Sequence, residues 1–284
     1  LGLRYLTILS DTEEQIKERD PAFSLSNIPL DDAETYAMIG RGQTLGVFQL
    51  ESAGMRNMLM QLNPENLEMI VAAISLSRPG PMDSIPKFIE CRHDPSKATY
   101  AIPQLEPILS STYGCVVYQE QVMQVCRKLA GYTYGHADIV RRAMSKKKHK
   151  VMEEERVNFV SGCRANGISE DAANKIFDEM ISFASYAFNK SHAAAYALIS
   201  YRTAYLKAHH PGAYLAALLT SVLGNHAKMA EYMAECARYN IRVLPPDINE
   251  SEMTFHASQT GKGGHIRYGL LALKNVGEQF IKAI

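Results

Sequence analysis

Apolar residues recur with helical spacing through most of the second half of the chain. Beyond Gly114 this pattern predicts seven helices with short breaks, at roughly 117–131, 134–147, 150–166, 169–187, 190–209, 212–223 and 226–240. Two of the breaks pair a helix-ending glycine with a helix-capping residue, Gly167 with Ser169 and Gly224 with Asn225. We therefore expect a mainly helical domain.

The first hundred residues have shorter and more mixed patterns. Asp31–Gly40 has helical spacing and a terminal glycine, and the apolar segment Gly46–Glu51 (GVFQLE) predicts a short strand or a tight turn. Asn63–Glu65 (NPE) is typical of a helix start, so a helix should run from there to about residue 76.

Beyond residue 242 the helical pattern ends. Ile266–Leu273 favours a strand, and Gly261–Gly264 (GKGG) is better explained as a β-turn than as a phosphate loop, because the G-x-x-x-x-G-K-[ST] spacing is missing. A small segment of mixed structure should therefore follow the helices.

Composition and charge narrow the classes of protein. The 284 residues are 46% hydrophobic, which supports a buried core and excludes a disordered tail. Lys plus Arg and Asp plus Glu are 30 each, so any argument for a nucleic-acid partner must come from local charge.

Five scattered cysteines without a C-x-x-C pair favour a reducing cytoplasm over a disulfide framework. No apolar stretch of about 18 residues predicts a membrane span. The chain has no initiating methionine and closes in mid-pattern, so we expect a fragment of a longer polypeptide.

A basic run is the strongest local signal for binding. Arg141–Lys150 (RRAMSKKKHK) holds six lysines and arginines and no acid. On one helix these cations would form a stripe that suits a polyphosphate or a nucleic-acid backbone. A solvated face explains the same run equally well on local grounds.

Three further segments place polar groups in apolar or rigid surroundings. In Asn189–His192 (NKSH) a cap residue would leave Lys190 and His192 near a helix N-terminus, although a cap alone explains the pattern too. The rigid loop Arg78–Pro81 could aim Arg78 at a ligand or leave it in solvent. Tyr118–Gln121 (YQEQ) is typical of an ordinary amphipathic helix start.

The spacing of the acidic and histidine residues gives little support for a metal site. Two-metal nucleotidyl transfer needs neighbouring carboxylates, and the chain has no D-x-D pair. His209 and His210 lack the spacing of a helical zinc site and should lie at a helix C-terminus. We expect the chain to bind no metal or cofactor by itself.

A series of ordered motifs resembles one family. The chain is similar to the alpha subunit of bacterial DNA polymerase III, the replicative C-family polymerase. The segments that carry the resemblance run in the family's order along nearly the whole chain: Leu1–Arg4, Gly46–Ser52 with Gly54 and Met55, Arg78–Pro81, Tyr118–Met123, Ala137 and Asp138 with Arg141–Met144, Phe188–Tyr196, and Leu244–Asn249.

The resemblance implies a fold and a domain organisation. Residues 1–100 would be the end of the palm and the base of the fingers, 101–242 a multi-helix fingers domain, and 243–284 the start of a helix-hairpin-helix and clamp-binding region. Leu273–Glu278 (LKNVGE) resembles the entry to that motif, whose second half would be cut off. The expected fold is mainly α, with a small α+β base and a truncated helix-hairpin-helix-like C-terminal segment.

The resemblance also implies a function, DNA-templated DNA synthesis. The catalytic aspartates, and with them the ligands of Mg²⁺, would lie outside this fragment, which would be inactive alone. Arg141 and Arg142 would contact the triphosphate of the incoming deoxynucleoside triphosphate (dNTP). Lys190, Ser191 and His192 would form a nucleotide-facing wall, with His192 beside the sugar where a ribose is excluded.

Weaker candidates complete the expected site. Gln49, Arg78 and Gln119 would neighbour the active site. The DNA-binding candidates are Lys146, Lys147, Lys148, Lys274 and Gly277. Partners implied for the full-length chain are primer-template DNA, a sliding clamp and other replicase subunits, and no membrane.

Two other classes of function stay open from the residues. The basic run could contact a nucleic-acid backbone with no role toward a triphosphate, which would make the chain a helical nucleic-acid-binding module. Alternatively the chain could be an interaction scaffold with a solvated basic run. Discrimination between triphosphate and monophosphate would separate the polymerase interpretation from the first alternative.

Overall fold

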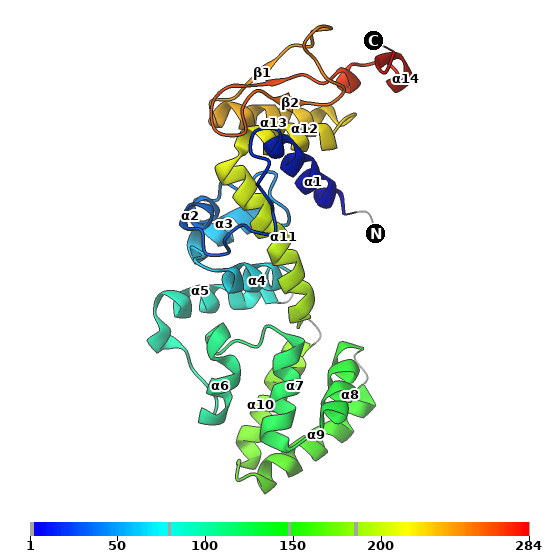
Figure 1. Cartoon of the computed structure of the whole chain (residues 1–284). Helices are drawn as coiled ribbons and strands as arrows, with labels where there is room; N and C mark the ends of the chain where they lie inside the picture. Colours follow the sequence, from blue (N-terminus) through cyan, green and yellow to red (C-terminus); the bar gives the residue numbers. More distant parts are fainter. Residues whose placement is uncertain (1–2, 79–80, 147–148, 185–186, 284) are drawn as a thin grey trace. The chain divides into compact units, whose positions relative to one another are not determined.

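Helices dominate the computed structural model, which describes residues 3–78, 81–146, 149–184 and 187–283 (Figure 1). The chain divides into two compact units. Unit 1 combines Leu1–Leu67 with Ala197–Ile284, and unit 2 is the single segment Glu68–Tyr196. The mainly helical fold class expected from the sequence is confirmed.

Unit 2 is built mainly from helices joined by short loops. The chain enters it on α4 (Leu67–Leu76) and leaves it on α11 (Lys190–His209), whose residues from Ala197 onward belong to unit 1. Between them come α5 (Ile85–His93), α6 (Glu106–Leu109), α7 (Gln119–Ala130), α8 (Tyr134–Ser145), α9 (His149–Ala165) and α10 (Glu170–Ala184).

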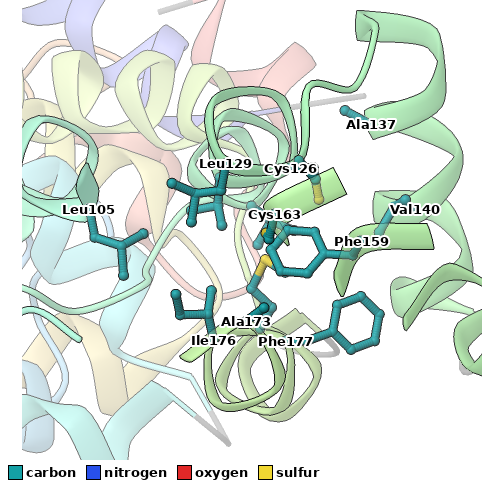
Figure 2. Close-up of a cluster of buried hydrophobic side chains, with 14 of the residues drawn as sticks. Leu105, Cys126, Leu129, Ala137, Val140, Phe159, Cys163, Ala173, Ile176 and Phe177 are labelled. Atoms are coloured by element: carbon teal, nitrogen blue, oxygen red, sulfur yellow. The ribbon is translucent and has the colours of Figure 1, made fainter. Parts of the chain in front are cut away.

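The helices α7–α10 pack around one hydrophobic core (Figure 2). Val140 of α8, Phe159 of α9 and Phe177 of α10 are fully buried there. Gly162 lets α9 approach the end of α7, because a Cβ atom at this position would come within 2.4 Å of the Ala130 carbonyl oxygen. This core fixes α7 and α8 against each other, and both carry candidate site residues.

Unit 1 combines helices with a small sheet. Its helices are α1 (Arg4–Lys17), α2 (Ala33–Gly40), α3 (Ala53–Leu62), the second half of α11, α12 (Pro211–Ser221), α13 (His226–Arg238) and α14 (Glu278–Ile281). The strands are β1 (Arg242–Leu244), β2 (His256–Ala257) and β3 (His265–Arg267). They form a sheet of order β1-β3-β2, in which β3 runs parallel to β1 and antiparallel to β2. The helix α12 is buried along nearly its whole length, and α1 packs against it.

Most of the predicted elements are present. The seven helices predicted beyond Gly114 correspond to α7–α13, and the helix expected at 31–40 is α2. The GKGG segment is the turn between β2 and β3, with Gly263 and Gly264 at positive φ. The five cysteines are free and buried, as the absence of a disulfide framework requires.

At Gly46–Glu51, where a short strand or a tight turn is expected, the structure has turns. Three other local predictions need correction. Asn63 does not start a helix; it ends α3 at φ 46°, and the next helix begins at Leu67. The strand expected at 266–273 is limited to β3. The basic run does not lie on one helix, because α8 ends at Ser145 and α9 begins at His149.

Candidate functional site

The arginine pair lies on α8 and shares one carboxylate. Arg141 donates from Nε to Asp138 Oδ1 over 2.8 Å, and its Nη2 lies 2.7 Å from the same oxygen. Arg142 reaches Asp138 Oδ2 with Nη2 over 2.6 Å. The hydrogen bond from Arg141 is the main cause that lowers the pKa of Asp138, so this carboxylate stays ionised. The side chain of Arg142 is 66% exposed, against 26% for Arg141.

Gln119 connects this pair to the start of α7. Its side-chain oxygen accepts a hydrogen bond from Arg141 Nη1 over 3.1 Å. The start of α7 is itself fixed, because the buried Gln121 side chain accepts hydrogen bonds from the backbone N–H groups of Val117 and Tyr118 over 2.8 and 2.9 Å. Arg141 is therefore held from two helices.

The start of α11 meets the same end of α7. Tyr118 and Phe188 form an isolated parallel β-bridge, in which the N–H of Gln119 donates to the carbonyl of Phe188 over 2.9 Å. The Glu120 carboxylate accepts from the Asn189 side chain over 2.8 Å and from the Lys190 N–H over 3.0 Å. A carboxylate at the positive end of a helix is favourable, and it fixes where α11 begins.

The side chain of Lys190 is paired as well. Its ammonium lies 2.5 Å from Glu68 Oε1 and 5.1 Å from the centre of the Tyr118 ring. Burial raises the pKa of Tyr118, whose hydroxyl has no hydrogen-bond partner among the described atoms. Tyr118 therefore acts here as a neutral aromatic surface beneath a cation.

The two residues after Lys190 are exposed. Ser191 and His192 occupy the first turn of α11, where the N–H of His192 donates to the Asn189 side chain over 2.8 Å, so the predicted cap is confirmed at Asn189. The His192 ring stacks on Tyr196 at 4.2 Å between ring centres. Arg78 places its guanidinium 3.8 Å from the centre of the Phe188 ring, next to the β-bridge.

The short segment Tyr118–Glu120 thus joins the predicted site residues of unit 2. Gln119 contacts Arg141 of the arginine pair, and Tyr118 and Glu120 contact the start of α11. We call this group the α7–α8–α11 cluster: Arg78, Tyr118, Gln119, Glu120, Asp138, Arg141, Arg142, Asn189, Lys190, Ser191 and His192. Its exposed guanidinium, imidazole and hydroxyl groups are hydrogen-bond donors of the kind that bind phosphate oxygens.

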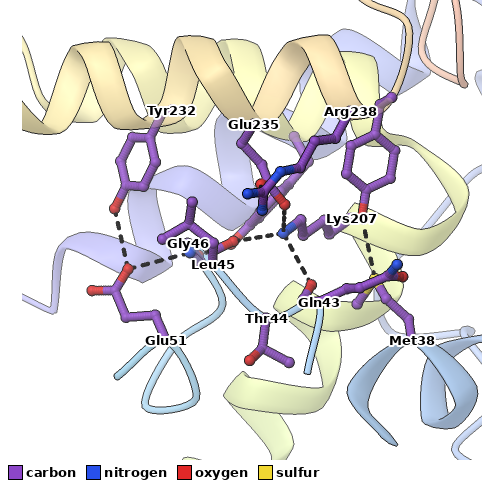
Figure 3. Close-up of polar contacts among 12 residues, drawn as sticks. Met38, Gln43, Thr44, Leu45, Gly46, Glu51, Lys207, Tyr232, Glu235 and Arg238 are labelled. Atoms are coloured by element: carbon purple, nitrogen blue, oxygen red, sulfur yellow. Dashed lines mark hydrogen bonds and ion pairs between the residues drawn. The ribbon is translucent and has the colours of Figure 1, made fainter. Parts of the chain in front are cut away.

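Gln49 belongs to unit 1 and lies outside this cluster. It is exposed at φ 62° in the Gly46–Ser52 loop, whose backbone is fixed by buried side chains. Tyr214 donates to the Gly46 carbonyl over 2.6 Å. The fully buried Lys207 of α11 donates to the carbonyls of Gln43 and Leu45, at the start of this loop, over 3.0 and 2.7 Å (Figure 3).

The predicted DNA-binding residues are divided between the units. Lys146 is exposed directly after α8, while Lys147 and Lys148 lie outside the described residues. Lys274 and Gly277 are exposed in unit 1, close to α14. Gly277 has an ordinary φ of −81°, and a Cβ atom there would meet open space, so local packing does not require glycine.

Sequence reasoning missed the carboxylates that pair with these cations. Asp138 could have been recognised, since it lies three and four residues before the arginines on a predicted helix, a spacing that brings side chains together. Glu120 stands inside a quoted motif, but its target 70 residues away is set by the tertiary fold. No local sequence pattern indicates that Glu68 pairs with Lys190.

The residues that the structure describes contain no group of three or more His, Cys, Asp or Glu side chains placed to hold a metal ion. No helix among them is both long and apolar enough to cross a membrane.

Comparison with known proteins identifies the family. Residues 5–167, more than half of the chain, match the family described as the bacterial DNA polymerase III alpha subunit finger domain. The chain belongs to this family. Residues 240–284 also match a helix-hairpin-helix motif family, which confirms the expected relationship of the C-terminal segment.

Two similar curated relatives carry the same name. The chain is 45% identical over its whole length to DNA polymerase III subunit alpha of Bacillus subtilis (strain 168) and 44% identical to that of Staphylococcus aureus (strain COL). It spans about a quarter of their length, 25% and 26%. The finger-domain match includes Arg141 and Arg142 of the α7–α8–α11 cluster, and Lys190–His192 follow it along the chain.

Proposed function

We propose that this chain is the part of a replicative DNA polymerase that binds the incoming dNTP. Support comes chiefly from the α7–α8–α11 cluster, in which Gln119 and Glu120 join the arginine pair to the start of α11. In this proposal Arg141 and Arg142 contact the triphosphate, and Lys190, Ser191 and His192 form the adjacent wall.

The chemistry of the cluster suits this role. A guanidinium offers planar paired donors that match phosphate oxygens, and two of them neutralise the charge that develops on the β- and γ-phosphates during nucleotidyl transfer. His192, held by its stacking on Tyr196, is the group proposed to lie beside the sugar. An unchanged ratio of ribonucleotide to deoxynucleotide incorporation in a His192→Ala polymerase would exclude that position.

In this proposal Mg²⁺ binds to the full-length polymerase and not to this chain alone. The described residues do not fit a magnesium site, because no three carboxylate, histidine or cysteine side chains converge. The proposal therefore places the metal ligands and the catalytic aspartates elsewhere in the full-length chain, which would act in the cytoplasm with a sliding clamp and other replicase subunits.

Contact with primer-template DNA is a second proposed role. It is supported by the helix-hairpin-helix match over residues 240–284 and by the exposure of Lys274 and Gly277. Backbone N–H groups next to an unhindered glycine can approach a DNA phosphate. Lys146 would add a contact to the phosphate backbone of the DNA. If Lys274 contacts a phosphate, Lys274→Ala should reduce the slope of log affinity against log salt by about one, and an unchanged slope would contradict the contact.

Steady-state kinetics of the full-length polymerase test the main proposal. The Arg141→Ala/Arg142→Ala variant should raise KM for dNTP and lower kcat, with a loss in kcat/KM of at least about tenfold, since a hydrogen bond to a charged group contributes about 1.5–3 kcal/mol.

A matched control removes the same charge from the same unit. Arg156 and Arg164 of α9 also form ion pairs, with Asp178 and Glu170. The Arg156→Ala/Arg164→Ala variant should retain nearly full kcat/KM. Equal effects of the two double variants would contradict a specific role for the α8 arginines.

A further inference from the structure

Asp138 occupies the donors that a phosphate would need. Its two oxygens contact Arg141 and Arg142 separately, at 2.7 and 2.6 Å, because one helical turn separates the carboxylate from both arginines. The carboxylate is itself 27% exposed, and Arg142 is 66% exposed, so solvent and ligands can reach the ion pair.

The two arginines differ in what else holds them. Arg141 keeps a contact outside α8, since its Nη1 donates to Gln119, whose own N–H is hydrogen-bonded to Phe188. If Asp138 withdraws, Gln119 still directs the Arg141 guanidinium. Arg141 can therefore exchange its acceptor without losing its contact with α7.

We propose that Asp138 is an internal competitor for the arginine pair, and that a polyphosphate binds by replacing its carboxylate. This inference rests on the proposed function, because it concerns how the same arginines accept their ligand. Asp138 thus sets the affinity of the site, and the exchange requires a change of hydrogen-bond acceptor only.

The expected effect follows from the strength of exposed ion pairs. Such pairs are weak in water, so removal of the competing charge should strengthen polyphosphate binding by only about 1.4- to 5-fold. The ion pairs of Asp138 with the arginines are weak enough for a polyphosphate to displace the carboxylate. They are still strong enough for the effect of their loss to be measured.

Two substitutions separate competition from positioning. Asp138→Asn removes the charge but keeps an oxygen that can accept from Arg141, whereas Asp138→Ala removes both. A competitor predicts tighter binding for both variants. A positioning residue predicts binding close to wild type for Asn and weaker binding for Ala, which would overturn the proposal.

The measurement is calorimetric titration of the 284-residue chain with inorganic tripolyphosphate, at one low and constant salt concentration. Asp178→Asn is the matched control, because it breaks another Arg–Asp pair of unit 2, formed with Arg156 at 2.5 Å. It changes the net charge equally and should leave the affinity within about 1.4-fold of wild type. An equal increase in Asp178→Asn and Asp138→Asn would overturn the proposal as a general charge effect.

The arginine variant keeps the two claims apart. If Arg141→Ala/Arg142→Ala abolishes binding while Asp138→Asn binds as wild type, the competitor is refuted and the arginine site stands. If the arginine variant binds as wild type, the arginine site fails, and any gain in Asp138→Asn then has another origin. No binding by wild type or Asp138→Asn up to millimolar tripolyphosphate overturns the competitor, while the polymerase kinetics still decide the proposed function.

Discussion

At the scale of single residues, the most constrained cation is Lys207. Its ammonium donates to the carbonyls of Gln43 and Leu45 and pairs with Glu235 at 2.7 Å, so all three of its protons have acceptors (Figure 3). Burial lowers the pKa of Lys207, while Glu235 favours its charged form. Lys207 thereby joins α11 and α13 to the backbone that leads into the Gly46–Ser52 loop.

Lys207→Met should therefore be strongly destabilising. It leaves a buried carboxylate and two buried carbonyls without their donor, and we expect a loss of about 3–5 kcal/mol in the free energy of unfolding, measured by urea denaturation. Lys17→Met is the control: it breaks an i,i+4 pair with Glu13 in which the lysine side chain is 44% exposed, and it should change the free energy by less than about 1 kcal/mol. Similar losses in the two variants would contradict this role of Lys207.

The ion pairs of the α7–α8–α11 cluster show what residue patterns can and cannot predict. The arginines and Lys190 were recognised as cations that need an anion, and the structure supplies each with a carboxylate from its own unit: Asp138 and Glu68. The spacing in the sequence indicates the pairing of Asp138 with the arginines, because these residues lie on one helix. The pairing of Glu68 with Lys190 spans 122 residues and depends on the fold, which no local pattern encodes.

At the scale of elements, helix ends are fixed by polar side chains whose partners are often distant. Asp32 caps α2 by accepting from the Thr35 N–H over 2.8 Å, and it also contacts His209 at the end of α11, 2.8 Å away. Burial raises the pKa of Asp32, but the hydrogen bonds from His209 and Thr35 outweigh this effect and lower it overall.

Asp32→Ala should cost about 0.5–2 kcal/mol near neutral pH, as the loss of a helix cap does. Because the folded-state pKa is lowered, the contribution of the carboxylate is complete above the unfolded value of about 3.9 and is lost as the pH falls through the folded value. The gap in unfolding free energy between wild type and variant should thus be larger at pH 6 than at pH 3. Asp31→Ala, an exposed neighbour, should show no such gap, and a gap independent of pH would contradict the assignment.

Long helices were more predictable from the sequence than short connections. The periodic apolar positions of α7, α8, α10 and α13 specify one buried face in each helix, which is the most reliable local signal. The helix α12 is instead buried on nearly all sides. The helix start predicted at Asn63 is wrong because asparagine, which favours helix starts, also tolerates the left-handed conformation in which it ends α3. The Gly46–Glu51 segment is apolar because its loop is buried, with Val47 and Leu50 fully enclosed, and burial in a loop resembles a strand in sequence.

At the scale of the whole molecule, unit 1 is built from both ends of the chain. Leu1–Leu67 and Ala197–Ile284 form one compact body, and the contacts that define it span most of the sequence. Periodicity cannot reveal such a division, because it carries no information on distant packing. The boundaries near residues 100 and 242 implied by the family resemblance describe another kind of division and stay a prediction.

The candidate site follows the same division. Residues proposed to contact the nucleotide lie in unit 2, whereas Gln49, Lys274 and Gly277 lie in unit 1. Motif order along the chain identified the family, which the finger-domain match over residues 5–167 confirms. Motif order did not reveal that Gln119 and Glu120 join the arginine pair to α11, since this depends on the packing of three helices.

One measurement tests the central claim most directly: titration of the 284-residue chain with dATP and Mg²⁺, followed by NMR signals of the backbone amides and the arginine Nε–H groups. The account predicts shifts concentrated at Arg141, Arg142 and Lys190, absent from the Arg141→Ala/Arg142→Ala variant. No shifts up to millimolar nucleotide would contradict a triphosphate site that is preformed in this chain, and shifts centred on Arg156 and Arg164 of α9 would contradict its location in the α7–α8–α11 cluster.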